Sequence, residues 1–448
     1  MNHNDGAPDR TAATGQLGFW MCLALVVGNM IGTGVFLLPA SLAPYGWNAV
    51  FGWMLTIGGA LCLAFVFARL ARAFPRAGGP YAYTREAFGP APAFLVAWSY
   101  WVSMWVGNAA IAIGTVSYVS ALIPPIAQVP GLHALVTCGM IWLLTAINCR
   151  GVRLAGGIQL LTAVLKLLPL IAVTLLAGLV ISADGGATLL PYRPQDITLP
   201  GITAAATLTL WGLLGLESAT VPAGKVVDPQ RTIPRATLIG TALTGFIYLF
   251  VCSAVSLLLP ASMAVNSNAP LADFVAIYWG GNAGLVLAAF AAISGFGTLN
   301  GWILLQGEMP NAMARDGVFP QWLAPVSRAG VPVRAHLVSS LLMTLLVLLN
   351  YARSMTELFT FIILLATTAS LVMYLVCALA ALRLSRTGRM QASPALSLVA
   401  LVAAAYALWT IYGAGREAVG WGAVLLLAGA PVYLTRAAAS DRPLSDPR

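Results

Sequence analysis

Gly28-Asn29-Met30-Ile31-Gly32-Thr33-Gly34 lies in the middle of a long apolar run, residues 18–42. Three glycines within seven residues, beside an asparagine and a threonine, make a poor helix. A second stretch of this kind, Trp211-Gly212-Leu213-Leu214-Gly215-Leu216-Glu217-Ser218, interrupts the apolar run 200–222 and adds the carboxylate of Glu217. If both runs cross a membrane as helices, we expect each helix to break near its middle.

The composition indicates that such runs do cross a membrane. Hydrophobic residues form 59% of the 448-residue chain and charged residues only 8%, whereas soluble proteins carry about 25% charged residues. The mean hydropathy is +0.86. Continuous apolar runs of about twenty residues have the length of transmembrane helices, which satisfy their own backbone hydrogen bonds in lipid. The sequence therefore predicts an all-α integral membrane protein.

Twelve runs fit this description, and the two interrupted runs are the first and the sixth. We place the spans at residues 18–42, 47–72, 91–122, 132–149, 155–181, 200–222, 236–260, 282–311, 335–351, 355–382, 394–412 and 418–435. The interrupted spans thus open two five-helix halves, residues 18–181 and 200–383. Matched broken helices are a sequence signature of a transporter's binding site, because the break frees N–H and C=O groups that can hold a ligand. The alternative interpretation is that Gly28 and Gly32, four residues apart, allow close helix packing.

Basic residues divide unequally between the two sides of this arrangement. With the N-terminus inside, nineteen Lys and Arg residues fall on the cytoplasmic side and three, Arg193, Arg353 and Arg416, on the other. Cytoplasmic loops carry such an excess of positive charge, so we expect both tails, residues 1–17 and 437–448, to be cytoplasmic. The multi-pass protein would lie in the cell inner (plasma) membrane. Its net charge of +9 then needs no nucleic-acid partner.

Several short motifs follow one another along residues 18–440. They are GNMIGTGVFLLPA at 28–40, AGGPYAY at 77–83, YWVSMWVGN at 100–108, LWGLLGLESA at 210–219, Gly301-Trp302, DGVFP at 316–320 and LVMYL at 371–375. In this order they resemble the amino acid–polyamine–organocation superfamily. The resemblance is closest to its basic amino acid/polyamine antiporters, including the arginine/agmatine exchangers.

The resemblance implies a leucine-transporter-type fold, a 5+5 inverted repeat over residues 18–383 with helices 1 and 6 broken. Two extra helices, at 394–436, would form the interface of a homodimer. It implies a secondary active amino acid transporter that works by alternating access. Such a protein would exchange a basic, arginine-like amino acid for its amine product or for another amino acid. The alternative is a proton-coupled symporter of neutral or cationic amino acids that uses Lys166.

The resemblance also assigns substrate contacts near the centre of helices 1, 3, 6, 8 and 10. The assigned residues are Met30, Gly32, Thr33, Gly34, Ser103, Met104, Asn108, Trp211, Leu214, Trp302 and Ala366. Thr33 and Gly34 would bind the substrate carboxylate, and backbone carbonyls of Met30, Trp211 and Leu214 would bind its α-ammonium group.

The far end of a basic substrate would meet different groups. Trp302 would stack on the distal cation, a contact worth about 2 kcal/mol or more when desolvated, and Asn108 would bond to it. Met104 and Ala366 stand where arginine/agmatine exchangers have polar side chains, and Ser103 where they have an alanine. Two polar contacts to the distal charge are thereby weakened, so a neutral amino acid stays open as the substrate.

Gating and coupling are assigned to charged and aromatic residues of the same helices. Glu217 is the carboxylate clearly at mid-membrane depth, where an ionisable group is costly and therefore usually functional. The resemblance pairs Glu217 with Tyr374 in a gate, to which Tyr100 and Trp302 also belong. Lys166, in the fifth span, has two open interpretations. Its ammonium group occupies the sodium position of sodium-coupled relatives, bridging spans 1 and 8, or it titrates and couples transport to protons, together with Glu217.

Other functional classes fit the sequence less well. An enzyme needs a nucleophile with a base, a metal cluster or paired carboxylates, and a channel needs a ring of repeated polar residues. The spans contain one central glutamate and one lysine, and the three histidines fall at span ends or in the tail. The six cysteines form no metal-binding pattern. We therefore expect no enzymatic activity, no metal and no cofactor; the partners are a small amino acid or amine and the lipid bilayer.

Overall fold

The computed structural model describes residues 17–76, 78–150, 166–221, 223 and 226–440. Described helices in the first half are α1 (Phe19–Met30), α2 (Thr33–Leu42), η1 (Ala43–Tyr45), α3 (Trp47–Ala73), α4 (Pro80–Phe88), α5 (Pro90–Leu122), α6 (Pro125–Gln128), α7 (Leu132–Arg150) and α9 (Leu167–Asp184). Those of the second half are η2 (Pro194–Asp196), α10 (Leu199–Leu210), η3 (Trp211–Leu213), η4 (Ser218–Thr220), α11 (Pro229–Leu258), α12 (Ala261–Asn266), α13 (Pro270–Trp279), α14 (Gly281–Arg315), η6 (Gln321–Leu323), α15 (Val333–Leu349) and α16 (Met355–Arg386). The chain ends with α17 (Pro394–Gly413), α18 (Gly415–Leu427) and α19 (Gly429–Ser440).

The predicted spans correspond to helices of the structure. Within the described residues, 11 helical segments are long and apolar enough to cross a membrane, and α15 is a shorter apolar helix of 17 residues. Together they match the twelve predicted spans, and both interrupted spans are broken where the glycines predicted. The predicted start of the fifth span, residues 155–165, lies outside the described residues.

The last predicted span differs from a single helix. Residues 418–435 belong to two helices, α18 and α19, which meet at Ala428. Pro431 follows within the first turn of α19. A proline has no N–H to donate to the carbonyl four residues earlier, so it interrupts a continuous helix and is tolerated where a new one begins.

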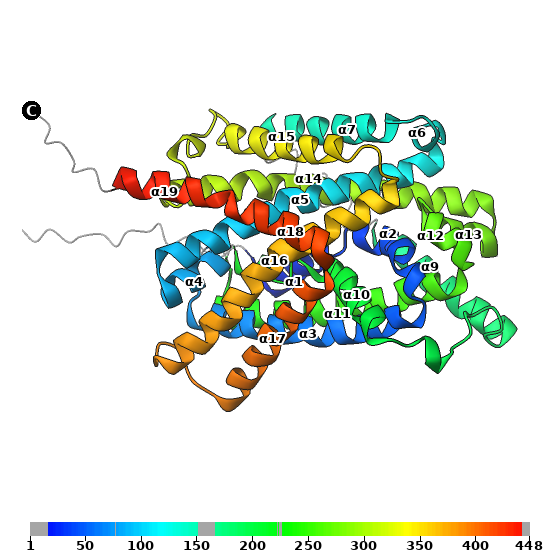
Figure 1. Cartoon of the computed structure of the whole chain (residues 1–448), viewed down its shortest axis with the longest axis horizontal. Coiled ribbons are helices and arrows are strands. Elements are labelled where there is room, and N and C mark those ends of the chain that lie inside the picture. Colours follow the sequence, from blue (N-terminus) through cyan, green and yellow to red (C-terminus); the bar gives the residue numbers. More distant parts are fainter. Residues whose placement is uncertain (1–16, 77, 151–165, 222, 224–225, 441–448) are drawn as a thin grey trace, which may run out of the picture.

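The centre of the molecule is built around α5. Figure 1 shows α5, α14 and α16 crossing the middle of the bundle, with α1 behind α16 and the short helices α12 and α13 near one end. Along α5 almost every side chain from Ala93 to Ser120 is buried. A helix that is apolar all round is a buried one, and α5 reaches burial on every side because α14, α16, α2 and α7 all pack against it.

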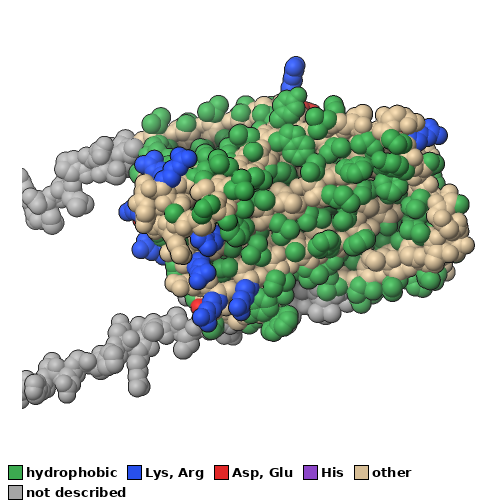
Figure 2. Space-filling view, turned by 90° about the horizontal axis from the view of Figure 1, so that it is seen from below, with side chains coloured by type: hydrophobic (Ala, Val, Ile, Leu, Met, Phe, Trp, Pro, Cys, Tyr) green, Lys and Arg blue, Asp and Glu red, His purple; other side chains and the backbone are tan. Residues whose placement is uncertain are grey.

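The outer surface fits a lipid environment. In Figure 2 hydrophobic side chains cover most of the visible flank, and the Lys and Arg side chains gather mainly at one end of the molecule. Large apolar residues such as Phe250, Leu349 and Leu398 are more than half exposed on α11, α15 and α17. The chain is a multi-pass membrane protein, since a soluble protein rarely exposes apolar surface on this scale.

Candidate functional site

The first break separates α1 from α2 at Ile31 and Gly32. Ile31 is extended (φ −76°, ψ 92°), and so is Gly32 (φ −124°, ψ −151°), after which α2 begins at Thr33. The helical hydrogen-bond series stops there, which exposes carbonyls at the end of α1 and N–H groups at the start of α2. The break predicted from the glycines is therefore confirmed, with Gly32 at its centre.

Side chains from other spans satisfy the carbonyls at the end of α1. Lys166 Nζ donates to the carbonyl oxygens of Gly28 (2.6 Å) and Ile31 (3.0 Å). Trp302 Nε1 donates to that of Asn29 (3.3 Å). The Met30 carbonyl accepts from Tyr248 Oη (2.7 Å) and from Gly32 N (2.9 Å).

These hydrogen bonds leave the Met30 carbonyl no free lone pair for a substrate. The Met30 carbonyl, which we expected to bind the substrate's α-ammonium group, already accepts two hydrogen bonds. A carbonyl oxygen has two lone pairs, so its capacity is filled within the protein. Met30 still lines the cavity described below.

The second break separates α10 from η4. The helix continues as the 3₁₀ turn η3, then Leu214 is extended (φ −65°, ψ 141°) and Gly215 has φ +100°. A positive φ of this size suits glycine, which has no side chain to clash. Asn29 Nδ2 donates to Ser218 Oγ (3.0 Å) and so connects the two breaks directly.

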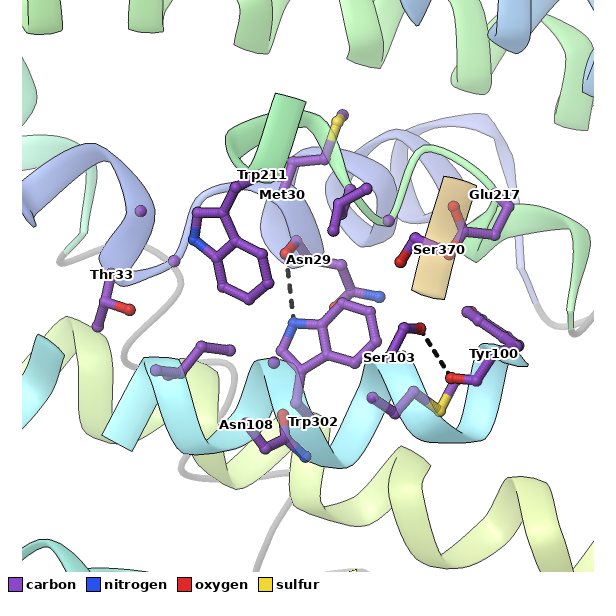
Figure 3. A pocket seen from close by; sticks show the side chains of 17 residues that line it. Asn29, Met30, Thr33, Tyr100, Ser103, Asn108, Trp211, Glu217, Trp302 and Ser370 are labelled. Atoms are coloured by element: carbon purple, nitrogen blue, oxygen red, sulfur yellow. Dashed lines mark hydrogen bonds between the residues drawn. The ribbon is translucent and has the colours of Figure 1, made fainter. Parts of the chain in front are cut away.

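The two breaks face each other across a cavity of ≈ 50 Å³, shown from close by in Figure 3. Its volume has room for a few water molecules and is far below the roughly 300–1,000 Å³ of typical ligand pockets. The structure brings together twelve of the predicted residues in its lining: Met30, Gly32, Thr33, Gly34, Tyr100, Ser103, Met104, Asn108, Trp211, Leu214, Glu217 and Trp302. The remaining lining residues are Asn29, Gly107, Ile111, Gly215 and Ser370.

Two tryptophans, Trp211 and Trp302, line this cavity. A side chain at Gly34 or Gly107 would come within about 3 Å of the Trp211 indole, at 3.1 Å and 3.0 Å respectively. These two glycines therefore form a slot for the Trp211 ring between α2 and α5. We expected Trp211 only as a backbone ligand, but its indole is also a wall of the cavity, with the Trp302 indole beside it (Figure 3).

Thr33 stands at the first position of α2 with an unpaired hydroxyl. Its side chain is 1% exposed, and its Oγ1 has no hydrogen-bond partner among the described residues. Tight packing holds it there, because a Cβ at Gly114 would lie 2.9 Å from Thr33 Cβ and one at Gly295 would lie 2.9 Å from Thr33 Cγ2. A buried polar group without a partner is rare and costly, and a helix N-terminus favours negative charge.

Three of the four predicted gate residues, Tyr100, Glu217 and Tyr374, meet at the opposite end of the cavity, without Trp302. Tyr374 Oη donates to Glu217 Oε2 (2.7 Å), and Tyr100 interacts with the same carboxylate. Glu217 is 1% exposed and Tyr374 is fully buried. Tyr374 does not line the cavity itself, whereas Glu217 and Tyr100 do, on the side away from Thr33 (Figure 3).

Three predicted residues lie outside the cavity wall. Ala366 is behind Gly107, at 3.9 Å from where a Gly107 Cβ would be. Tyr374 supports Glu217, and Lys166 is 3% exposed beneath the first break. Both hydrogen bonds of Lys166 go to carbonyls of the first span; among the described residues they do not extend to the eighth span, as the expected bridge would require.

Sequence reasoning missed three polar residues of the site. Asn29 and Ser370 line the cavity, and Gln306 accepts a 2.7 Å hydrogen bond from Asn108 Nδ2. Asn29 belongs to the quoted glycine motif and could have been suspected from it. Ser370 directly precedes the motif at 371–375 on α16, and Gln306 lies one helical turn after Trp302 on α14, so these motifs were the signal for both.

Comparison with known proteins places these motifs in a family. Residues 17–437 match the amino acid permease family. The chain is similar to the cadaverine/lysine antiporter of Escherichia coli K12, with 34% identity over 335 residues, 75% of this chain and 74% of the relative. It is also similar to a putative arginine/ornithine antiporter of Bacillus subtilis, 31% identical over 89% of this chain and 92% of the relative. The putrescine transporter PotE of Haemophilus influenzae is 29% identical over 94% of this chain and 97% of the relative.

Proposed function

Since this chain belongs to the amino acid permease family, within the amino acid–polyamine–organocation superfamily, we propose that it is a secondary transporter that exchanges a basic amino acid for its amine product. The similar proteins named above are a cadaverine/lysine antiporter, a putative arginine/ornithine antiporter and a putrescine transporter. All of these ligands carry a positive charge at the end of an alkyl chain. Because relatives are named as antiporters, the expected alternative of proton symport is not favoured.

One observation carries the proposal: the cavity offers an anion site at one end and cation sites elsewhere. The unpaired Thr33 hydroxyl and the first N–H groups of α2 suit a carboxylate. The indole of Trp302 and the amide of Asn108 suit a cation, the indole through its π face. An amino acid would then lie with its carboxylate at Thr33 and its side-chain cation between Trp302 and Asn108.

The same geometry explains how one site serves both substrates. A diamine lacks the carboxylate, so it would use the cation sites and leave Thr33 without a partner. The extended Leu214 turns its carbonyl out of the helical series, and we assign it to the ammonium group that both substrates share. Exchange follows naturally when the two ligands compete for the same cation sites.

The surrounding residues would control access. The buried bond between Tyr374 and Glu217 closes one end of the cavity, and the Trp211 indole between Gly34 and Gly107 closes another side. Alternating access would require these contacts to break in turn. Lys166 would hold the first break open, because its ammonium group donates hydrogen bonds to two carbonyls that otherwise have no helical partner.

The distribution of basic residues and the apolar surface of the last helices suggest how the protein is oriented and assembled. Both termini would face the cytoplasm of the cell inner membrane, following the nineteen-to-three distribution of basic residues. Large apolar residues stay exposed on the last helices, among them Leu398, Tyr412 and Trp421. We propose that α17–α19 use this surface to form a homodimer.

The test is exchange by purified protein in proteoliposomes. Uptake of labelled lysine, ornithine or arginine is measured with the lumen empty, loaded with the same amino acid, or loaded with cadaverine, putrescine or agmatine. Each condition is run with and without an inward proton gradient. The proposal predicts uptake with a loaded lumen for at least one pair of amino acid and amine. Uptake into empty vesicles that needs the gradient would replace exchange by symport, and absence of uptake in every condition would remove basic amino acids as substrates.

A further inference from the structure

A chain of buried hydrogen bonds runs from the cavity residue Asn108 through α14 to α15 and α7. Asn108 Nδ2 donates to Gln306 Oε1 (2.7 Å), and Gln306 Nε2 donates to Ser340 Oγ (3.4 Å). Ser340 Oγ and Thr145 Oγ1 are 2.7 Å apart, and Thr145 Oγ1 donates to the backbone carbonyl of Ile141 (2.7 Å). The four polar side chains are each at most 1% exposed.

The far end of this chain fixes its direction. A hydroxyl carries one hydrogen, and Thr145 uses its hydrogen on Ile141. With that hydrogen on Ile141, Ser340 is the donor in the contact between the two hydroxyls, a contact whose distance alone allows either direction. Its own hydrogen is then used as well, so that Ser340 can only accept from Gln306.

That direction passes through Gln306 to the cavity. Because Ser340 can only accept, the amide nitrogen of Gln306 faces Ser340 and its oxygen faces Asn108. Asn108 therefore donates from its Nδ2 to the Gln306 oxygen, and its own Oδ1 stays on the cavity side. Figure 3 shows the nitrogen of Asn108 turned away from the cavity and the oxygen on the side of Trp302. An oxygen there accepts hydrogen bonds and attracts positive charge.

We propose that Gln306, held by Ser340 and Thr145, is a positioning residue that determines substrate charge specificity by keeping the Asn108 oxygen toward the cavity. The inference rests on the proposed function, since it assumes that the side-chain end of an amino acid meets Asn108. A cation donates to this oxygen in a charge-assisted hydrogen bond, which is roughly twice as strong as a bond from a neutral donor. The neutral ends of citrulline and glutamine also carry N–H groups, but their bond to the oxygen lacks the charge, and a carbonyl placed there would face another oxygen. The hydrogen-bond chain from Asn108 to Thr145 therefore favours cations over neutral ligands.

The backbone of Gln306 is held independently of its amide. Ser339 Oγ donates to the Gln306 carbonyl (3.4 Å) and accepts from Trp101 Nε1 (3.0 Å). Ser339 is as buried as its neighbour Ser340, but its hydroxyl bonds to the backbone carbonyl of Gln306 and to Trp101 rather than to the Gln306 side chain. Ser339→Ala is therefore the matched control for Ser340→Ala: it deletes an equally buried hydroxyl on the same helix without affecting amide orientation.

The experiment measures equilibrium binding to purified protein for two matched pairs of ligands. Citrulline is arginine with a carbonyl oxygen in place of one guanidinium nitrogen, and glutamine is ornithine with a carbonyl in place of the methylene next to its terminal nitrogen, which makes that nitrogen a neutral amide. We expect wild type to prefer the cation in at least one pair. Gln306→Leu should lower that preference about tenfold, equivalent to about 1.4 kcal/mol. Ser340→Ala should lower it in the same direction, whereas Ser339→Ala should leave it unchanged.

Two further variants separate positioning from simple packing. Gln306→Glu keeps an oxygen that accepts from Asn108 Nδ2, so it should retain the preference that Gln306→Leu loses. When Asn108 is already replaced by leucine, Gln306→Leu should produce no additional change in the ratio of affinities for the cationic and the neutral ligand. A wild-type preference that survives in both Gln306→Leu and Ser340→Ala would overturn the inference. If wild type prefers the cation in neither pair, the proposed function fails, and the inference fails with it.

Discussion

Replacing Thr33 with valine should separate the binding of amino acids from that of diamines. The valine side chain has nearly the same shape and lacks the hydroxyl. In the structure this hydroxyl is buried and has no partner among the described residues. Its removal therefore breaks no hydrogen bond of the ligand-free protein, and the free energy of unfolding should stay the same or rise, since an unsatisfied buried polar group costs about 1–3 kcal/mol.

The bound amino acid should respond in the opposite direction. A hydrogen bond from Thr33 Oγ1 to the substrate carboxylate involves a charged group and contributes about 1.5–3 kcal/mol. Its loss should raise the Kd of the amino acid by about 10- to 150-fold. A diamine has no carboxylate and should bind to Thr33→Val as it binds to wild type.

The assay is binding of labelled lysine and cadaverine to purified protein, with thermal unfolding measured on the same samples. Thr115→Val is the control, because Thr115 is buried nearby and its hydroxyl donates to Ile111 within its own helix (2.7 Å). It should lower stability by about 1 kcal/mol without changing the affinity ratio of the two ligands. Equal losses for lysine and cadaverine in Thr33→Val, or no loss for lysine, would refute the assignment of the carboxylate to Thr33.

Three other changes test the cation site, the gate and the lysine. Trp302→Leu should weaken binding of basic substrates by about 2 kcal/mol, far more than Trp302→Phe; equal affinities in the two variants would remove the cation–π contact. Glu217→Gln keeps an oxygen for Tyr374 but removes the charge, so the rate of exchange should lose its pH dependence; a profile identical to that of wild type would show that Glu217 does not titrate during transport. Lys166→Met leaves the carbonyls of Gly28 and Ile31 without their donor, so it should lower both the Tm and the exchange rate at every pH. A loss confined to one end of the pH range would instead assign Lys166 to proton coupling.

The fold was predictable because its determinants are local. Each span is a continuous apolar run, and each break coincides with clustered glycines in residues 28–34 and 211–218. Such signals need no knowledge of tertiary contacts, since helix propensity and the bilayer's thickness decide them. The division of the last span at Ala428 is also local, and Pro431, three residues later, could have indicated it because it has no N–H.

The site was predictable only in part, because some of its features depend on which helices meet. The glycine motifs and the resemblance to antiporters indicated Thr33, Trp302 and Glu217. The pairing of Asn108 with Gln306 joins residues 198 positions apart; Gln306 follows Trp302 by one helical turn, but nothing in the sequence shows that it meets Asn108. The slot for Trp211 likewise requires Gly34 and Gly107 to lie on opposite sides of one indole.

Gly107 shows why a glycine can be misjudged from sequence. It lies within α5, a regular helix where glycine is unfavourable by about 1 kcal/mol relative to alanine. The structure accounts for it, because a Cβ there would lie 3.0 Å from the Trp211 ring. Close approach to a side chain from another half of the protein is a tertiary property, which composition and periodicity do not reveal.

A structure of the protein with its basic amino acid bound would test the central claim most directly. The account predicts that the ligand lies between the two broken helices, with its carboxylate within hydrogen-bonding distance of Thr33 Oγ1 and the α2 N-terminus. Its side-chain cation should lie over the Trp302 ring and donate to the oxygen of Asn108. A ligand bound outside this cavity, or one whose carboxylate points toward Asn108 and whose cation points toward Thr33, would contradict it.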